Sequence, residues 1–205
     1  MKCRYNANFL LNGINVLLIC SFIIFTNSVQ AAQQRLALII GNSSYSDAPL
    51  RNPVNDASDM AQALKELDFQ VILQTNANLQ KMEAAIEEFG VKLEKNKGIG
   101  LFYYAGHGIQ SKRTNYLIPV NSKIDRETEL RYKAVNIQRV LDEMEYANNG
   151  LNIAILDACR NNPLVRSFRS STRGLARLDQ SPKGLFLAYS TDPGNVAIDG
   201  EGRNS

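Results

Sequence analysis

Short apolar runs alternate along this chain with segments in which apolar residues recur every three or four positions. The five runs are strand candidates, at residues 36–40, 69–73, 99–104, 152–156 and 185–189. Most are apolar at consecutive positions, which is typical of parallel strands covered on both faces.

The segments between these runs predict amphipathic helices, each with one apolar stripe. The stripes are Met60, Leu64 and Leu67; Met82, Ile86, Phe89 and Leu93; and Ile137, Val140, Leu141 and Met144. Asn78 and Asn136 stand at expected N-cap positions, and Pro53 suits a first helical turn. Strands alternating with helices over 205 residues predict one α/β domain with an open, mostly parallel sheet flanked by helices on both faces.

The first 31 residues have the pattern of a signal peptide. An apolar stretch follows Lys2 and Arg4, and small residues precede an expected cleavage point after Ala31. A retained membrane anchor is the alternative, because the stretch is only a little short of the ~20 residues that span a bilayer. Cleavage predicts an exported protein of the periplasm or cell envelope, without stable membrane association, whose domain occupies residues 35–205.

Removal of this segment changes the number of thiols. Cys3 and Cys20 are lost, so Cys159 becomes the single cysteine and no intrachain disulfide can form. An unpaired cysteine in an exported protein is open to oxidation, which favours a reactive role over the alternative of a small buried apolar residue. The net charge of +3 is too small to predict nucleic-acid binding.

Two of the strand candidates lead directly into residues with reactive side chains. Residues 99–104 precede Gly106, His107 and Gly108, and residues 152–156 precede Asp157 and Cys159. The carboxyl ends of parallel strands meet at one sheet edge, so these groups converge if the strands are neighbours. A thiol with a pKa of about 8.5 needs such an imidazole partner to become a nucleophilic thiolate. A purely structural role for the single histidine is the alternative.

The same residues carry a resemblance to the caspase-like (peptidase C14) family. Asp157, Ala158, Cys159 and Arg160, with His107 about 50 residues upstream, resemble the caspase signature. Asp157 replaces a glutamine, a departure shared with bacterial metacaspase-type peptidases. The resemblance extends from about residue 35 to the end through the segments 38–45, 50–57, 103–108, 189–194 and 199–205. The sequence ends after a glycine-rich turn without a closing element, which indicates a truncated fragment of such a domain.

The resemblance implies a cysteine endopeptidase in which Cys159 attacks the scissile carbonyl and His107 moves the proton. The backbone amides of Gly108 and Cys159 would then form the oxyanion hole. Asp157 lies two residues before the nucleophile and shares its face in an extended chain, and in metacaspases the matching aspartate pairs with one at the position of Asp56. Two carboxylates predict cleavage after Arg or Lys. Alternatively, Asp56 interacts with the helix dipole and Asp157 is a structural cap.

Several expectations concern regions and partners beyond this site. The basic segment 160–183 predicts a mobile surface loop. The expected partners are protein or peptide substrates, and no cofactor or metal is predicted, although many metacaspases depend on calcium and such dependence stays open. A different reading is a caspase-like interaction domain that binds peptides or proteins without cutting them.

Overall fold

The computed structural model describes residues 34–159, 175, 184–190 and 202–204. The predicted signal peptide lies outside the described residues, and so does the predicted basic loop, with the exception of Leu175. Within these described ranges, no helix is both long enough and apolar enough to cross a membrane.

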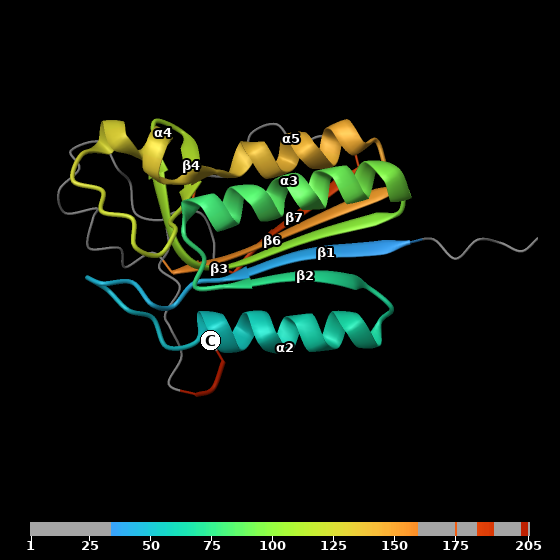
Figure 1. Ribbon diagram of the computed structural model, residues 1–205, viewed down its shortest axis with the longest axis horizontal. Helices are drawn as coiled ribbons and strands as arrows, with labels where there is room; N and C mark the ends of the chain where they lie inside the picture. Colours follow the sequence, from blue (N-terminus) through green and yellow to red (C-terminus); the bar gives the residue numbers. More distant parts are fainter. Residues whose placement is uncertain (1–33, 160–174, 176–183, 191–201, 205) are drawn as a thin grey trace, which may run out of the picture. The chain divides into compact units, whose positions relative to one another are not determined.

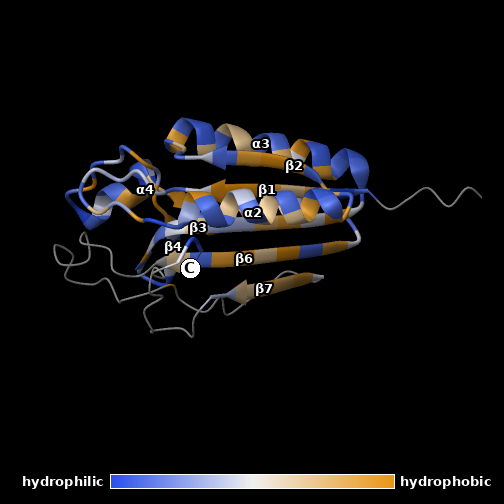
Figure 2. Cartoon of the chain, turned by 90° about the horizontal axis from the view of Figure 1, so that it is seen from below, coloured by the Kyte–Doolittle hydropathy of each residue, from blue (hydrophilic) through white to orange (hydrophobic). Residues whose placement is uncertain are grey.

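Five parallel strands form the centre of the domain, in the order β2-β1-β3-β6-β7 (Figures 1 and 2). This confirms the predicted open parallel sheet. Each strand contains or closely overlaps one of the five apolar runs, since consecutive β-branched and aromatic residues suit a strand buried on both faces. The strands are β1 (Arg35–Gly41), β2 (Gln70–Thr75), β3 (Ile99–Ser111), β6 (Leu151–Cys159) and β7 (Leu185–Tyr189).

Helices cover both faces of this sheet, as predicted. Helix α2 (Pro53–Glu66) lies on one face, and α3 (Leu79–Asn96) and α5 (Ile137–Ala147) lie on the other (Figure 1). Side chains alternate along β1, so its even-numbered residues pack toward α3 and its odd-numbered residues toward α2. The burial of both sets explains why β1 is apolar at consecutive positions.

The helix starts agree with the sequence, whereas one helix end does not. The side chains of Asn78 and Asn136 accept hydrogen bonds from the backbone amides of Lys81 and Gln138, each at 3.0 Å, and Pro53 opens α2. Leu67 was expected in the buried stripe of α2, but it caps the helix end and is 56% exposed. The helix ends one residue earlier, where the chain turns toward β2.

Strand β3 is longer than the apolar run that predicts it. It was expected to end at residue 104 but continues to Ser111, because its polar and glycine-rich half pairs with two other strands. One is β6; the other is β4 (Thr114–Leu117), which is antiparallel and pairs in turn with β5 (Val135–Asn136). These pairings supply the hydrogen bonds that local propensity does not predict.

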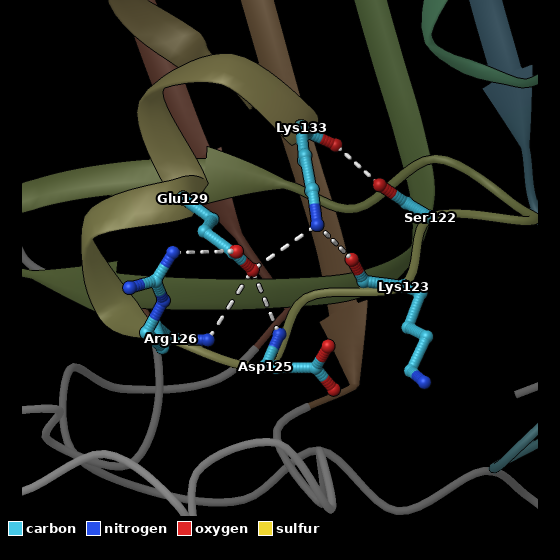
Figure 3. Close-up of polar contacts among 6 residues, drawn as sticks. All are labelled: Ser122, Lys123, Asp125, Arg126, Glu129 and Lys133. Carbon is cyan, nitrogen blue, oxygen red and sulfur yellow. Dashed lines mark hydrogen bonds and ion pairs between the residues drawn. The ribbon is translucent and has the colours of Figure 1, made fainter.

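The connection between β4 and β5 is held by the carboxylate of Glu129. This connection contains the short helices η2 (Glu127–Glu129) and α4 (Leu130–Lys133). Figure 3 shows the carboxylate accepting the backbone amides of Asp125 at 3.0 Å and Arg126 at 3.3 Å, with the Lys133 ammonium 3.1 Å away. These donors, the Asp125 amide first and then Lys133, lower the pKa of Glu129 to about 2.

Replacement of Glu129 by glutamine is therefore expected to lower stability at neutral pH and to remove part of its acid dependence. Because the folded-state pKa lies below the ordinary 4.5, the stabilisation is present above pH 4.5 and is lost as the pH falls toward 2. Urea denaturation at pH 7, 5 and 3 measures the free energy of unfolding of both proteins. The difference between wild type and Glu129→Gln should become smaller as the pH is lowered. The exposed pair of Glu88 with Lys92 offers a control, Glu88→Gln, for which little change is expected. A stability difference that is the same at all three pH values would contradict the stabilising role of the ionised Glu129 carboxylate.

Candidate active site

His107 and Cys159 lie on neighbouring strands at the carboxyl edge of the sheet. They are partners in the parallel register of β3 and β6, the last pair of that ladder. Adjacent strands are about 4.8 Å apart, so the two backbones lie side by side as the sequence predicted. Both residues belong to the strands themselves, whereas the sequence placed them in bends after the strands. Pairing between β3 and β6 extends both strands through the reactive residues.

The His107 imidazole is buried and oriented by a backbone carbonyl. Its exposed fraction is 3%, and Nε2 lies 2.7 Å from the carbonyl oxygen of Ala48, in the connection between β1 and α2. A carbonyl can only accept, so Nε2 carries the proton and donates it in this bond. In the neutral ring Nδ1 is then the nitrogen with the basic lone pair. The arrangement leaves Nδ1 as the atom able to take up a proton.

Two tyrosines hold the backbone of His107. The hydroxyl of Tyr45 accepts the His107 amide proton at 3.0 Å and donates to the carbonyl of Ile118 at 3.0 Å. The Tyr104 hydroxyl donates to the His107 carbonyl at 2.8 Å. The Tyr45 ring also packs on the imidazole, with ring centroids 4.3 Å apart and planes tilted by 48°. The position of the imidazole therefore depends on side chains from two separate segments.

Gly106 is required by this packing. Its φ of +153° lies in a region that L side chains rarely adopt. A Cβ there would lie 2.7 Å from the Tyr45 hydroxyl and 2.8 Å from the Tyr104 hydroxyl. The sequence predicted that glycines beside His107 allow a sharp local backbone; for Gly106 the structure gives the reason, which is close approach of both tyrosines.

The segment that carries Tyr45 and Ala48 is anchored by a buried asparagine. Asn42 is fully buried, and its side chain accepts the Ala77 amide at 2.8 Å. It donates to the carbonyls of Ala77 and Ile118, both at 3.3 Å. The bonds join the ends of β1, β2 and β4, so the loop over His107 is tied to three strands of the sheet.

Gly108, predicted to supply an oxyanion-hole amide, directly follows His107 in β3. A Cβ on Gly108 would lie 3.0 Å from the Ala158 Cβ, so its backbone packs against the residue that precedes Cys159. The two proposed amide donors thus occur on adjacent strands at one sheet edge. A side chain at Gly108 would also contact Leu175, at 2.9 Å.

Asp157 and Asp56 both lie on the α2 side of the sheet, near its carboxyl edge. Asp157 pairs in register with Ala105 and alternates with Ile155, and it accepts a hydrogen bond from the Tyr103 hydroxyl at 3.4 Å. Asp56 is buried in the first turn of α2, the helix that packs on this face. The position of Asp56 also fits its alternative role at the helix N-terminus.

The family model for the caspase domain of peptidase C14 matches residues 34–205. That span is the greater part of the chain and includes β1 to β7 with both reactive residues. The chain belongs to the caspase-domain family. This family membership confirms the resemblance that the motifs around His107 and Cys159 indicated.

Relatives of this caspase domain include animal proteins. The human mucosa-associated lymphoid tissue lymphoma translocation protein 1 is 32% identical over 136 residues, which are 66% of this chain and 16% of the human protein. Zebrafish caspase a is 33% identical over 67 residues, covering 32% of this chain and 18% of that protein. The chain therefore spans less than a fifth of the length of the relatives it matches. Bacterial origin and export remain predictions that these relatives do not test.

A solved structure shows the same fold. The Drosophila initiator caspase Dronc superposes with a TM-score of 0.54 at 14% sequence identity, over 80% of this chain and 59% of that one. At this identity the likeness concerns the fold alone, and it agrees with the caspase-like sheet expected from the sequence.

Three contributors to the site of this caspase domain were missed by the sequence reasoning. Tyr45 was noted only as part of the opening motif, Tyr104 as a strand residue, and Ala48 not at all. Tyrosine hydroxyls close to the ends of two apolar runs, at Tyr45 after residues 36–40 and at Tyr104 in residues 99–104, are a signal that could have drawn attention to both residues. The Ala48 carbonyl is a backbone group, and no side-chain pattern marks it.

A metal centre was not predicted, and calcium dependence stays open. In the portion of the chain that the structure describes, no group of three or more His, Cys, Asp or Glu side chains is arranged to hold a metal ion.

Proposed function

We propose that this chain is a cysteine endopeptidase that cleaves peptide bonds after Arg or Lys by means of Cys159 and His107. The observation that carries the proposal is the register pairing of His107 with Cys159, combined with the bond from Nε2 of His107 to the Ala48 carbonyl. This bond places the ring proton on Nε2 and the basic lone pair on Nδ1, which is the proposed acceptor of the thiol proton. Membership of the peptidase C14 family supports the same reaction.

In the proposed mechanism Cys159 transfers its proton to Nδ1 of His107 and the thiolate attacks the scissile carbonyl. The developing oxyanion accepts hydrogen bonds from the amides of Gly108 and Cys159; in another peptidase, removal of one such donor costs about 2.7 to 4 kcal/mol. Collapse of the tetrahedral intermediate breaks the C–N bond, and the imidazolium returns its proton to the leaving amine. Water then hydrolyses the thioester, with His107 acting as base. These steps use protein groups and water alone.

Specificity for a basic residue is proposed to come from Asp157 and Asp56. Both lie on the α2 side of the sheet, Asp157 near the end of β6 and Asp56 in the first turn of α2, so a guanidinium or ammonium group entering at this edge would meet negative charge. The domain contains a related interaction on the exposed side of α2. There the Arg203 guanidinium bonds both carboxylate oxygens of Asp59, at 2.9 and 3.2 Å, and lowers the pKa of that carboxyl.

A peptide panel tests the proposal. Peptides that differ only in Arg, Lys, Asn or Asp at the cleavage position should be cut after Arg and Lys only. Asp157→Asn should lower kcat/KM for the Arg peptide roughly 10- to 100-fold, the effect of one charge-assisted hydrogen bond, and Asp56→Asn should act in the same direction. Asp142→Asn changes an exposed acid on α5 and serves as a matched control with unchanged activity. Equal turnover after Asp and Arg would contradict the specificity.

The rival function is a caspase-like domain that binds peptides or partners without cleavage. The two functions differ in the chemistry of the thiol. In a background with Cys3 and Cys20 replaced by serine, a peptidase should show a thiol that reacts with iodoacetamide below pH 7, because the imidazolium stabilises the thiolate. Alkylation only above about pH 8 would favour the binding module. Addition of calcium or of a chelator in the same assay tests metal dependence.

Export to the periplasm or cell envelope is proposed from the signal-peptide pattern of residues 1–31 alone. Mass spectrometry of the secreted protein should find an N-terminus at Ala32, and an intact N-terminus would favour the retained anchor.

A further inference from the structure

A pocket of about 280 Å³ lies beyond the candidate active site, between the β3–β4 hairpin and the connection that contains η2 and α4. One wall is formed by the hairpin residues Ser111, Lys112 and Tyr116, and the other by Glu127, Thr128 and Arg131. The volume is at the lower limit for small-molecule sites, which begin near 300 Å³. The pocket is therefore suited to one side chain or a similarly small group.

The charge of the pocket favours an anion. The lining residues include two cations, Lys112 of the hairpin and Arg131 of the opposite connection, and one carboxylate, Glu127. Glu127 accepts a hydrogen bond of 2.5 Å from the Ser111 hydroxyl, which joins the walls. Among the described residues neither Lys112 nor Arg131 has an ion-pair partner, and Arg131 packs over the Tyr132 ring at 4.6 Å. Lys112 and Arg131 line the same pocket, and ammonium and guanidinium groups are both donors for a carboxylate.

The walls are held in place before any ligand enters. Ser111 ends the β3 ladder with β4, which fixes the hairpin. The opposite wall is fixed by Glu129, whose carboxylate accepts two backbone amides of the same connection and pairs with Lys133 (Figure 3). A pre-formed site of this kind loses little conformational entropy on binding.

The distance from the reactive residues relates the pocket to a substrate. Strand β3 runs without interruption from His107 to Ser111, and four residues at ~3.3 Å each span about 13 Å. An extended peptide covers this length with about four residues. We infer that the pocket binds the carboxylate side chain of an Asp or Glu located about four residues from the scissile bond. This inference rests on the proposed peptidase function and adds a second, acidic specificity to the basic one.

A position scan tests the inference with the full chain. Peptides with Arg at the cleavage position carry one Asp at each of five positions on either side, and each is matched by an Asn peptide. Asp about four residues away should raise kcat/KM about tenfold over Asn, mainly through KM. The double variant Lys112→Gln with Arg131→Gln should bring this ratio to about one, and Lys81→Gln, an exposed cation on α3, should leave it unchanged. No Asp preference, or one that survives the double variant, overturns the inference.

A binding measurement separates this inference from the peptidase proposal. Acetyl-aspartate amide, but not acetyl-asparagine amide, should shift the backbone amide resonances of residues 111–116 and 127–131 in the Cys159→Ala protein. Such shifts without cleavage of any peptide would support the pocket while refuting the peptidase function. Cleavage without shifts and without an Asp preference would refute the pocket alone. Shifts together with cleavage that shows no Asp preference would mean that the pocket takes a free carboxylate ligand, and would overturn its assignment to the substrate.

Discussion

Replacement of Cys159 by alanine is expected to abolish peptide hydrolysis, with a loss in kcat on the order of 10⁴-fold or more. The thiol is the proposed nucleophile, and its backbone pairs in register with that of His107. His107→Ala should cause a loss of similar size, because a lone thiol with a pKa of about 8.5 is mostly protonated at neutral pH. Steady-state kinetics with the Arg peptide measures both losses.

The double variant and the thiol titration make this prediction specific. Cys159→Ala combined with His107→Ala should lose no more activity than either single variant, since the two residues act as a unit. In His107→Ala the pH midpoint of alkylation should rise toward about 8.5. Circular dichroism should show that both single variants remain folded. Retention of a tenth of the activity in either variant would contradict the proposed mechanism.

Gly106→Ala is expected to have the largest effect of any change outside the reacting residues. The new Cβ would lie 2.7 Å from the Tyr45 hydroxyl and 2.8 Å from the Tyr104 hydroxyl, at a φ unfavourable for alanine. Relief requires movement of the groups that hold the His107 backbone. We expect a loss of about 2 to 5 kcal/mol in the free energy of unfolding. A displacement of the imidazole by about 1 Å should also lower kcat about 100-fold.

Two further variants identify the cause of this effect. Gly202→Ala is the matched control, since the nearest atom to its Cβ would be 3.7 Å away, and its stability and activity should match wild type. In a Tyr45→Phe background the additional cost of Gly106→Ala should be smaller, because one of the two clashing oxygens is absent. Urea denaturation and kinetics of the four proteins in this cycle provide the comparison. If the effects of Gly106→Ala and Tyr45→Phe on stability simply add in the double variant, the steric explanation is wrong.

The main strands and helices were predictable because the sequence signals for them lie within short segments of the chain. The consecutive apolar residues of β1 and the helical spacing of α3 reflect burial against neighbours that every parallel sheet of this kind requires. The caps at Asn78 and Asn136 were also visible, since each is a contact between residues two or three apart. By contrast, β4 and β5 were missed, because short strands in polar sequence are stabilised by their partners rather than by their own composition.

At the candidate site, the sequence could mark only the two proposed reactive residues. His107 and Cys159 were marked by residue type, by their positions after apolar runs and by the family motif. The Ala48 carbonyl that orients His107 lies 59 positions away in the chain. Tyr45 is 62 positions away and contacts both the ring and the backbone of His107. Contacts of this sequence separation depend on how the connection between β1 and α2 folds over the sheet edge.

The sequence by itself determined the five parallel strands with the three main helices between them, the family, and His107 and Cys159 as the proposed reactive pair. Each of these depends on local periodicity or on a short motif. The tertiary structure alone decided that β3 continues through His107 and that two tyrosines and one carbonyl position it. It also brought Lys112 and Arg131 to opposite walls of one pocket. These features depend on hydrogen-bond partners and side chains that become neighbours only after the chain has folded, and no single segment carries a signal for them.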